Sequence, residues 1–205
     1  MEEEIQGKYL PKRTTNHFYI GVHYRGTDKI EEELNPEQHP KHYSYHKIYN
    51  LLVNRAREVM AEKPSADIYI IACSDEQPFL DFLKKKLNRK LIYYPGATRS
   101  RLDTSNLQDD FTSIPNRNMD VDLVGLGKEK LETYKKRKQL IDNSIHLGNK
   151  NVSNYTKGLD CLLDCYMLED VDILYKFKGN FSYFTEYLNK NPNLISYNIH
   201  EELEK

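Results

Sequence analysis

Short apolar runs alternate along the chain with longer amphipathic stretches. Five runs are rich in β-branched and aromatic residues and are apolar on both faces, which is typical of strands inside a parallel sheet. They cover residues 17–23 (HFYIGVH), 67–73 (DIYIIAC), 90–94 (KLIYY), 172–177 and 194–199. We therefore predict five strands that are buried on both sides.

Helical patterns fill the intervals between these runs. Residues 44–62 carry apolar side chains near helical spacing, with Ser44 as a candidate N-cap. A second helix is expected after Ser74-Asp75. A further helix is predicted over residues 155–168, and we expect four of its residues to form the buried side: Leu159, Leu162, Leu163 and Tyr166. The remaining predicted helices cover residues 128–145 and 182–188.

This alternation of strands and helices predicts the α/β fold class, with a single doubly wound, mainly parallel Rossmann-like sheet and right-handed crossovers. The chain has 205 residues, which suits one domain. We expect that domain over residues 17–205, after a lead-in at 1–16 and with an irregular loop insert at 97–127.

Composition narrows the possible ligands. The net charge is −1, so no global basic field would attract nucleic acid, and an anionic ligand must be held by a local site. The longest apolar run, around residues 68–73, is too short for a membrane span. The start of the chain is acidic and lacks the apolar core of a signal peptide, which favours a cytoplasmic protein.

Polar residues follow three of the predicted strands, at residues 23–29 (HYRGTDK), 74–76 (SDE) and 178–182 (KGNFS). Ligands of parallel α/β sheets bind beyond the carboxyl ends of the strands, so these segments are expected to share one site. An arginine fork, a lysine and the N–H groups at a helix start are the groups that bind a diphosphate. The strand ends therefore predict a phosphate-binding edge.

Other phosphate and metal motifs are missing from the sequence. It contains no G-x-x-x-x-G-K-[ST] run and no G-x-G-x-x-G after a strand, which argues against P-loop NTPases and dinucleotide oxidoreductases. Asp120-Val121-Asp122 resembles the Asp-x-Asp metal motif of some glycosyltransferases, but it follows no clear strand. We expect no metal and no other cofactor.

The segment IGVHYRGTDK at residues 20–29 resembles the His-x-Arg-[Arg/Gly]-Thr-Asp-Lys signature of the α1,6-fucosyltransferase superfamily, which includes the nodulation-factor fucosyltransferases. Residues 68–80 (IYIIACSDEQPFL) and 158–184 resemble two further segments of that family in order and spacing. The likeness covers about residues 17–200 and implies a donor-binding domain, one half of a GT-B architecture, that uses GDP-fucose or a related GDP-sugar.

The resemblance also implies roles for individual residues. Arg25 would bind the β-phosphate, His23 would lie near the nucleoside, and Asp164 would pair with the two adjacent N–H donors of guanine. Glu33 falls where the family carries a proposed acceptor-side base. The other matching residues of the first motif are Gly26, Asp28 and Lys29, and Asp75 belongs to the polar pair that ends the second segment. A second phosphate-binding turn is implied at Gly179, Asn180, Phe181 and Ser182.

Structural interpretations of the same residues stay open. Arg25 could form a surface ion pair, His23 could make a core hydrogen bond, and Asp75 could be a helix N-cap. Glu33 ends a run of three glutamates, which is commonly a solvated charge cluster. Gly26 stands where many family members have a second arginine, so one positive charge of the motif is missing.

The favoured hypothesis is an enzyme that transfers the sugar of a GDP-sugar to a glycan hydroxyl with inversion, without a metal. The alternative is a non-catalytic GDP-sugar-binding module or subunit that lacks its acceptor domain, and a third possibility is an α/β domain for another nucleotide. Only one half of the GT-B arrangement is expected here, so a partner chain or a homo-oligomer could complete the cleft.

Overall fold

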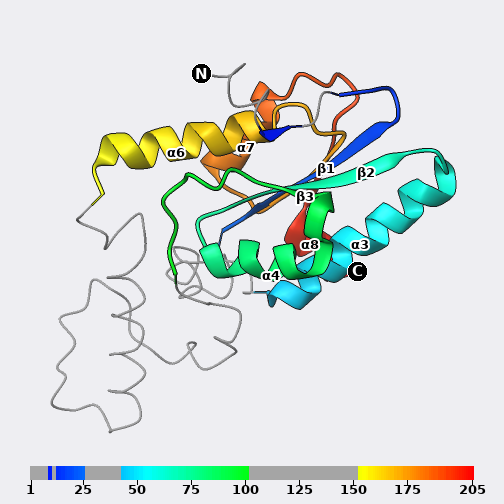
Figure 1. The fold of residues 1–205 in the computed structure, drawn as a ribbon, viewed down its shortest axis with the longest axis horizontal. Coiled ribbons are helices and arrows are strands. Elements are labelled where there is room, and N and C mark those ends of the chain that lie inside the picture. The colour runs from blue at the N-terminus through cyan, green and yellow to red at the C-terminus, as the bar shows by residue number, and fades with distance from the viewer. Residues whose placement is uncertain (1–8, 11–12, 26–42, 102–151) are drawn as a thin grey trace, which may run out of the picture.

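The computed structural model describes residues 9, 10, 13–25, 43–101 and 152–205. Within them, five strands form one sheet in the order β3-β2-β1-β4-β5, and every neighbouring pair is parallel (Figure 1). The strands are β1 (His17–Tyr24), β2 (Asp67–Ser74), β3 (Leu91–Ile92), β4 (Ile173–Lys176) and β5 (Ile195–Asn198). A parallel sheet covered by helices on both faces confirms the predicted fold class.

The central strand β1 marks the point where the winding reverses. The chain runs outward from β1 to β2 and β3, then returns to place β4 and β5 on the other side of β1. In sheets of this kind, a crevice opens between the strands at the reversal, beyond their carboxyl ends. The carboxyl ends of β1 and β4 are therefore where a ligand site is expected.

Helices α3 (Tyr45–Glu62), α4 (Gln77–Leu87) and α8 (Ile199–Leu203) cover one face of the sheet (Figure 1). Helix α3 begins where the sequence predicts, because the Ser44 hydroxyl accepts a hydrogen bond from Lys47 N at 3.4 Å. Alternate residues of β1 point toward this face, and they pack in one apolar core with residues of the helices: Ile20, Val22, Tyr24, Ile48, Leu52, Phe79, Leu83 and Ile199.

Helices α6 (Asn154–Met167) and α7 (Asn180–Leu188) lie on the opposite face. Gly21 of β1 faces the end of α6, and a Cβ atom at this position would come within 2.9 Å of Leu168 Cδ2. The glycine therefore permits the close approach of helix and sheet. Tyr19 and His23, two residues to either side of Gly21, face the same way, and this layer positions the site described below.

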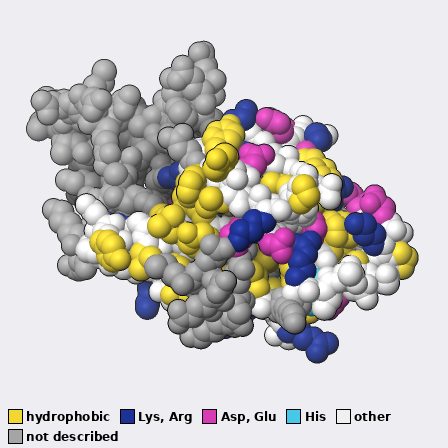
Figure 2. All heavy atoms as spheres, turned by 90° about the horizontal axis from the view of Figure 1, so that it is seen from above, with side chains coloured by type: hydrophobic (Ala, Val, Ile, Leu, Met, Phe, Trp, Pro, Cys, Tyr) yellow, Lys and Arg dark blue, Asp and Glu magenta, His cyan; other side chains and the backbone are white. Residues whose placement is uncertain are grey.

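The outer side of α6 and α7 carries several exposed large hydrophobic residues. Figure 2 looks onto this side of the molecule and shows hydrophobic side chains among charged ones. Leu162 is exposed, so the predicted buried face of this helix is wrong at that position. The helix instead turns Leu163, Asp164 and Cys165 inward, which places a carboxylate beside the sheet.

Several element boundaries differ from the prediction. Strand β3 is shorter than expected at both ends: Lys90 belongs to a 3-10 turn, η1 (Asn88–Lys90), and the strand stops at Ile92, before residues 93 and 94. Helix α4 has Glu76 at its N-cap, and helix α7 begins at Asn180 rather than at residue 182. Helix α8 was not predicted.

The predicted helix at 128–145 and most of the irregular insert lie outside the described residues. In the part of the chain that is described, no helix is long and apolar enough to cross a membrane.

Candidate functional site

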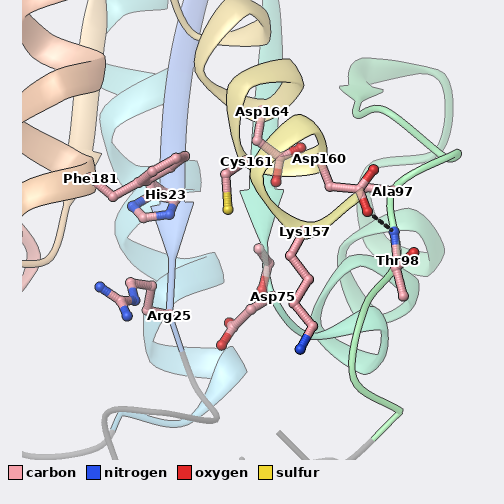
Figure 3. A pocket seen from close by; sticks show the side chains of 11 residues that line it. His23, Arg25, Asp75, Ala97, Thr98, Lys157, Asp160, Cys161, Asp164 and Phe181 are labelled. Atoms are coloured by element: carbon pink, nitrogen blue, oxygen red, sulfur yellow. Dashed lines mark hydrogen bonds between the residues drawn. The ribbon is translucent and has the colours of Figure 1, made fainter. Parts of the chain in front are cut away.

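A polar pocket lies at the carboxyl end of the sheet, where the winding reverses (Figure 3). Its walls come from the ends of β1 and β2, the first turn of α7, one side of α6, and the segment that follows β3. Eleven residues line it: His23, Arg25, Ser74, Asp75, Ala97, Thr98, Lys157, Asp160, Cys161, Asp164 and Phe181.

His23 is held in one orientation at the end of β1. Its Nδ1 atom lies 2.8 Å from the Ser182 hydroxyl, and its ring lies against that of Phe181 with centroids 4.7 Å apart. Ser182 is only 1% exposed, so its hydroxyl lies behind the imidazole rather than in the pocket. Ser182 thus fixes the His23 ring from α7, while Phe181 offers a flat apolar surface to the pocket.

Arg25 lies two residues beyond His23, on the same wall of the pocket (Figure 3). Its Nη1 atom would be 3.5 Å from a Cβ atom built on Gly179, the N-cap of α7. The guanidinium is therefore close to the start of a nine-residue helix, where N–H donors and the helix dipole favour an anion. A phosphate bound here would receive both kinds of donor.

Asp164 projects from α6 into the opposite wall. One of its oxygens, Oδ1, accepts a hydrogen bond from Arg99 Nη2 at 3.1 Å, and the Arg99 side chain is 1% exposed. Burial raises the pKa of Asp164 to about 7, an effect that Arg99 opposes and that Asp160 and Asp75 reinforce. Near neutral pH this carboxyl group is poised between its neutral and ionised forms.

Asp160 lies one helical turn before Asp164 on the same side of α6. Its Oδ2 atom accepts a hydrogen bond from the backbone N–H of Thr98 at 2.9 Å (Figure 3). Consecutive residues after β3 therefore hold both carboxylates of α6: Thr98 through its backbone and Arg99 through its side chain.

Positive and negative groups alternate around the pocket. Arg25 and Lys157 supply side-chain cations, and Asp75 lies between them at the mouth (Figure 3). Asp75 is not the N-cap of α4, since that place belongs to Glu76. The Cys161 thiol also lines the pocket, and burial raises its pKa, which disfavours the thiolate and hence a role as nucleophile.

The structure brings together residues from all three segments that the sequence singled out. Those that line the pocket are His23, Arg25, Asp75, Asp164 and Phe181, while Gly179 and Ser182 lie directly behind them. Asn180 is the first residue of α7. Four predicted site residues lie outside the described part of the chain: Gly26, Asp28, Lys29 and Glu33.

Sequence reasoning missed the residues contributed by the α6 start and by the segment after β3: Thr98, Arg99, Lys157, Asp160 and Cys161. A signal existed for two of them. Asp160 precedes Asp164 by four residues, and Lys157 precedes it by seven, so all three share one side of a helix. No local pattern marks Thr98 or Arg99, since their partners lie more than sixty residues away.

Among the described residues, no group of three or more His, Cys, Asp or Glu side chains is arranged to hold a metal ion. Asp120 and Asp122 lie outside the described residues.

These features define the chain as a Rossmann-like α/β protein with a polar pocket at the carboxyl end of its sheet. No family model matches the sequence, and no curated protein matches it. Its fold is similar to that of "NodZ alpha-1,6-fucosyltransferase soaked with GDP-fucose", a crystal structure, with a TM-score of 0.40 and 14% identity. The match covers 92% of this chain and 40% of that one. A likeness at this level assigns no ligand and no residue role.

Proposed function

We propose that the pocket binds a GDP-sugar, with GDP-fucose as the first candidate, and that the chain acts in the transfer of the sugar to a glycan hydroxyl. One observation carries the proposal. Segments of the sequence that were singled out separately, around residues 25, 75, 164 and 181, line a single pocket at the reversal point of the sheet. The strand ends meet at this edge in any parallel sheet, but Asp164 and Phe181 come from helices, and they line the same pocket.

The proposed donor pose follows from the charges of the pocket. The diphosphate lies against Arg25 and the start of α7, with Lys157 as a further cation from α6. Charge that develops on the leaving GDP is then stabilised by groups already in place, which is how preformed donors accelerate bond cleavage. His23 and Phe181 lie together on one side of the proposed nucleoside position, and their neighbouring rings, tilted by 44° to each other, offer it an aromatic contact surface.

Asp164 is the proposed partner of the base. Guanine presents two neighbouring N–H donors, and an ionised carboxylate can accept both, whereas adenine and uracil present no such pair. Each carboxylate oxygen has two lone-pair directions, so the bond from Arg99 leaves acceptor capacity toward the pocket. The roles of Lys29 as a second phosphate contact and of Glu33 as the base that activates the acceptor remain part of the proposal.

The test is calorimetry with GDP-fucose, GDP-mannose, GDP, UDP-glucose and ADP, followed by a transfer assay with glycan acceptors. We expect the three guanine ligands to bind and the other two to bind at least about tenfold more weakly. Equal binding of all five would remove the guanine assignment. GDP-sugar binding without transfer, in the presence of a range of glycans, would favour the non-catalytic module.

A further inference from the structure

Residues 97–101, here termed the strap, follow β3 and cross the end of β2. Ser100 N donates a hydrogen bond to Asp75 O at 2.7 Å, and Gln77 N donates one to Ser100 O at 2.8 Å. Glu76 and Ser100 form a parallel β-bridge. The backbone of the strap is therefore fixed to the start of α4 and to the pocket wall.

Arg99 projects inward from the strap. Its Nε atom donates to Ser74 O at 2.9 Å and Nη1 donates to Ala97 O at 3.2 Å, while Nη2 binds the Asp164 carboxylate. The bond from Nε to Ser74 O and the backbone bonds of Ser100 with Asp75 and Gln77 already anchor the strap. The bond to Asp164 fixes the position of the carboxylate and favours its ionised form.

Asp164 needs such a partner because burial and two neighbouring carboxylates oppose its ionisation. It is almost fully buried, and both Asp160 and Asp75 disfavour a second negative charge beside them. The sulfhydryl of Cys73 donates to the Asp164 backbone oxygen, and Cys73 is a second group besides Arg99 that favours the ionised carboxylate.

The titratable and charged groups that face Asp164 come from every element around it. Its own helix α6 supplies Lys157, Asp160, Cys161 and Cys165, and the end of β2 supplies Cys73 and Asp75. Arg99 comes from the strap, and His23 and Arg25 lie across the pocket.

We infer that Arg99 is a positioning residue that sets the base selectivity of the pocket, by holding the Asp164 carboxylate ionised and aimed at the two N–H donors of guanine. This inference rests on the proposed function. A neutral carboxyl group would present a hydroxyl to one of those donors, and a carboxylate free to rotate would meet them in a poor orientation. Affinity for GDP thus requires the ion pair, whereas affinity for ADP does not.

A consequence is a pH-dependent preference for guanine. As the pH falls through about 7, Asp164 takes up a proton and the preference for GDP over ADP decreases. Removal of the Arg99 charge raises the pKa of Asp164 and moves this loss to higher pH. Removal of the Asp160 charge has the opposite effect, because a like charge disappears.

The experiment measures GDP and ADP dissociation constants by calorimetry from about pH 5.5 to about pH 8.5 for the wild-type chain, Arg99→Met, Arg99→Lys and Asp160→Asn. Circular dichroism establishes that each variant is folded. Asp160→Asn is a well-matched variant, since an amide oxygen can still accept the bond from Thr98 N. We expect the wild-type preference for GDP to fall about tenfold toward low pH.

The variants give results in opposite directions. Near neutral pH, Arg99→Met lowers the preference for GDP about tenfold or more, Arg99→Lys lowers it less, and Asp160→Asn shifts the pH midpoint downward. A folded Arg99→Met variant with unchanged preference and midpoint overturns the inference. If that variant does not fold, an unchanged midpoint in Asp160→Asn, or an Arg99→Lys variant identical to wild type, overturns it.

The proposed function fails separately. If the wild-type chain prefers GDP and the variants keep that preference, only the inferred role of Arg99 is refuted. A wild-type chain with no preference for GDP over ADP at any pH removes both the guanine assignment and the role of Arg99.

Discussion

The two ends of the sheet are both lined by charged residues, but they use charge differently. At the amino end, the Asp172 carboxylate accepts hydrogen bonds from Tyr19 N at 2.8 Å, from Asn191 at 3.0 Å and from Arg13 at 2.5 Å. Arg13 also pairs with Asp170. These bonds connect the start of β1, the start of β4 and the turn before β5, so charge at this end ties segments of the chain together.

Both ends have a pocket, but at the amino end the charged groups Arg13 and Asp172 that line it are bonded to each other, whereas at the carboxyl end a lysine in the pocket wall has no such ion pair among the described residues. Lys157 makes no ion pair with any described residue, and it lines the pocket together with Arg25 and Asp75 (Figure 3). The carboxylate of Asp164 is buried there, with a raised pKa. Groups that serve only to hold a fold are usually satisfied within it, whereas groups with perturbed pKa values in a pocket are candidates for function. The comparison favours the carboxyl end as the place of the proposed site.

The largest expected effect comes from a matched pair of arginine variants. Arg25→Ala should weaken GDP-sugar binding and use by about 2–4 kcal/mol, because it removes charge-assisted contacts to the diphosphate, and it should leave the fold intact. Arg13→Ala should leave GDP affinity unchanged and lower the free energy of unfolding by about 1 kcal/mol or less, because its ion pairs are partly exposed. Calorimetry and urea unfolding measure the two effects. Reversed results would place the ligand at the amino end.

Asp172→Ala provides the counterpart for a carboxylate. The variant loses the acceptor for three hydrogen bonds, one of them from the backbone of β1. We expect the free energy of unfolding to fall by about 2–3 kcal/mol, with GDP affinity unchanged once the chain is folded. A loss of GDP affinity in the folded variant would contradict the division of roles between the two ends.

Asp164 should give stability an unusual pH dependence. The folded-state pKa of about 7 lies above the ordinary aspartate value of 3.8, so between these pH values the folded chain holds a proton that the unfolded chain has released. Protonation therefore stabilises the fold: relative to Asp164→Asn, the wild-type chain gains about 1.4 kcal/mol for each unit by which the pH is lowered within that interval. Urea unfolding of both chains over this range measures the difference. Parallel curves would mean that Asp164 is ionised throughout.

Chelation is expected to have the smallest effect. GDP binding, and any sugar transfer, should persist in EDTA because side-chain cations and the start of α7 contact the diphosphate in the proposed complex. A dependence on Mn²⁺ or Mg²⁺ would draw attention to Asp120 and Asp122 and would weaken the proposed role of Arg25.

The strands and most helices could be predicted because their signals are local. The run HFYIGVH is apolar on both faces and becomes β1, and Ser44 caps α3 as its position before an amphipathic stretch indicates. Helix α8 was missed because its five residues directly follow β5 and are mostly polar. Its packing against the core is set by tertiary contacts, with Ile199 fully buried.

The site was predictable only in part, because some of its residues are placed by tertiary contacts and not by local sequence signals. Arg25 and Asp164 belong to segments with recognisable patterns, and both line the pocket. Arg99 carries no such pattern: its role depends on a bond to a residue 65 positions away, across a stretch whose spatial course the sequence does not reveal. The burial of Asp164 likewise depends on the rotation of α6 about its axis. The sequence pattern predicted that rotation incorrectly at Leu162, which is exposed.

The most direct test is an NMR titration of the isotope-labelled chain with GDP, in which every perturbed amide is mapped onto the sheet. The account predicts that perturbations concentrate at the carboxyl end, at His23, Arg25, Thr98, Asp164 and Phe181, and that Arg13, Asp172 and Asn191 at the amino end stay unchanged. The same amides should respond far less to ADP. Perturbations centred on the amino end, or none with GDP at millimolar concentration, would contradict the claim that this pocket binds a guanine nucleotide.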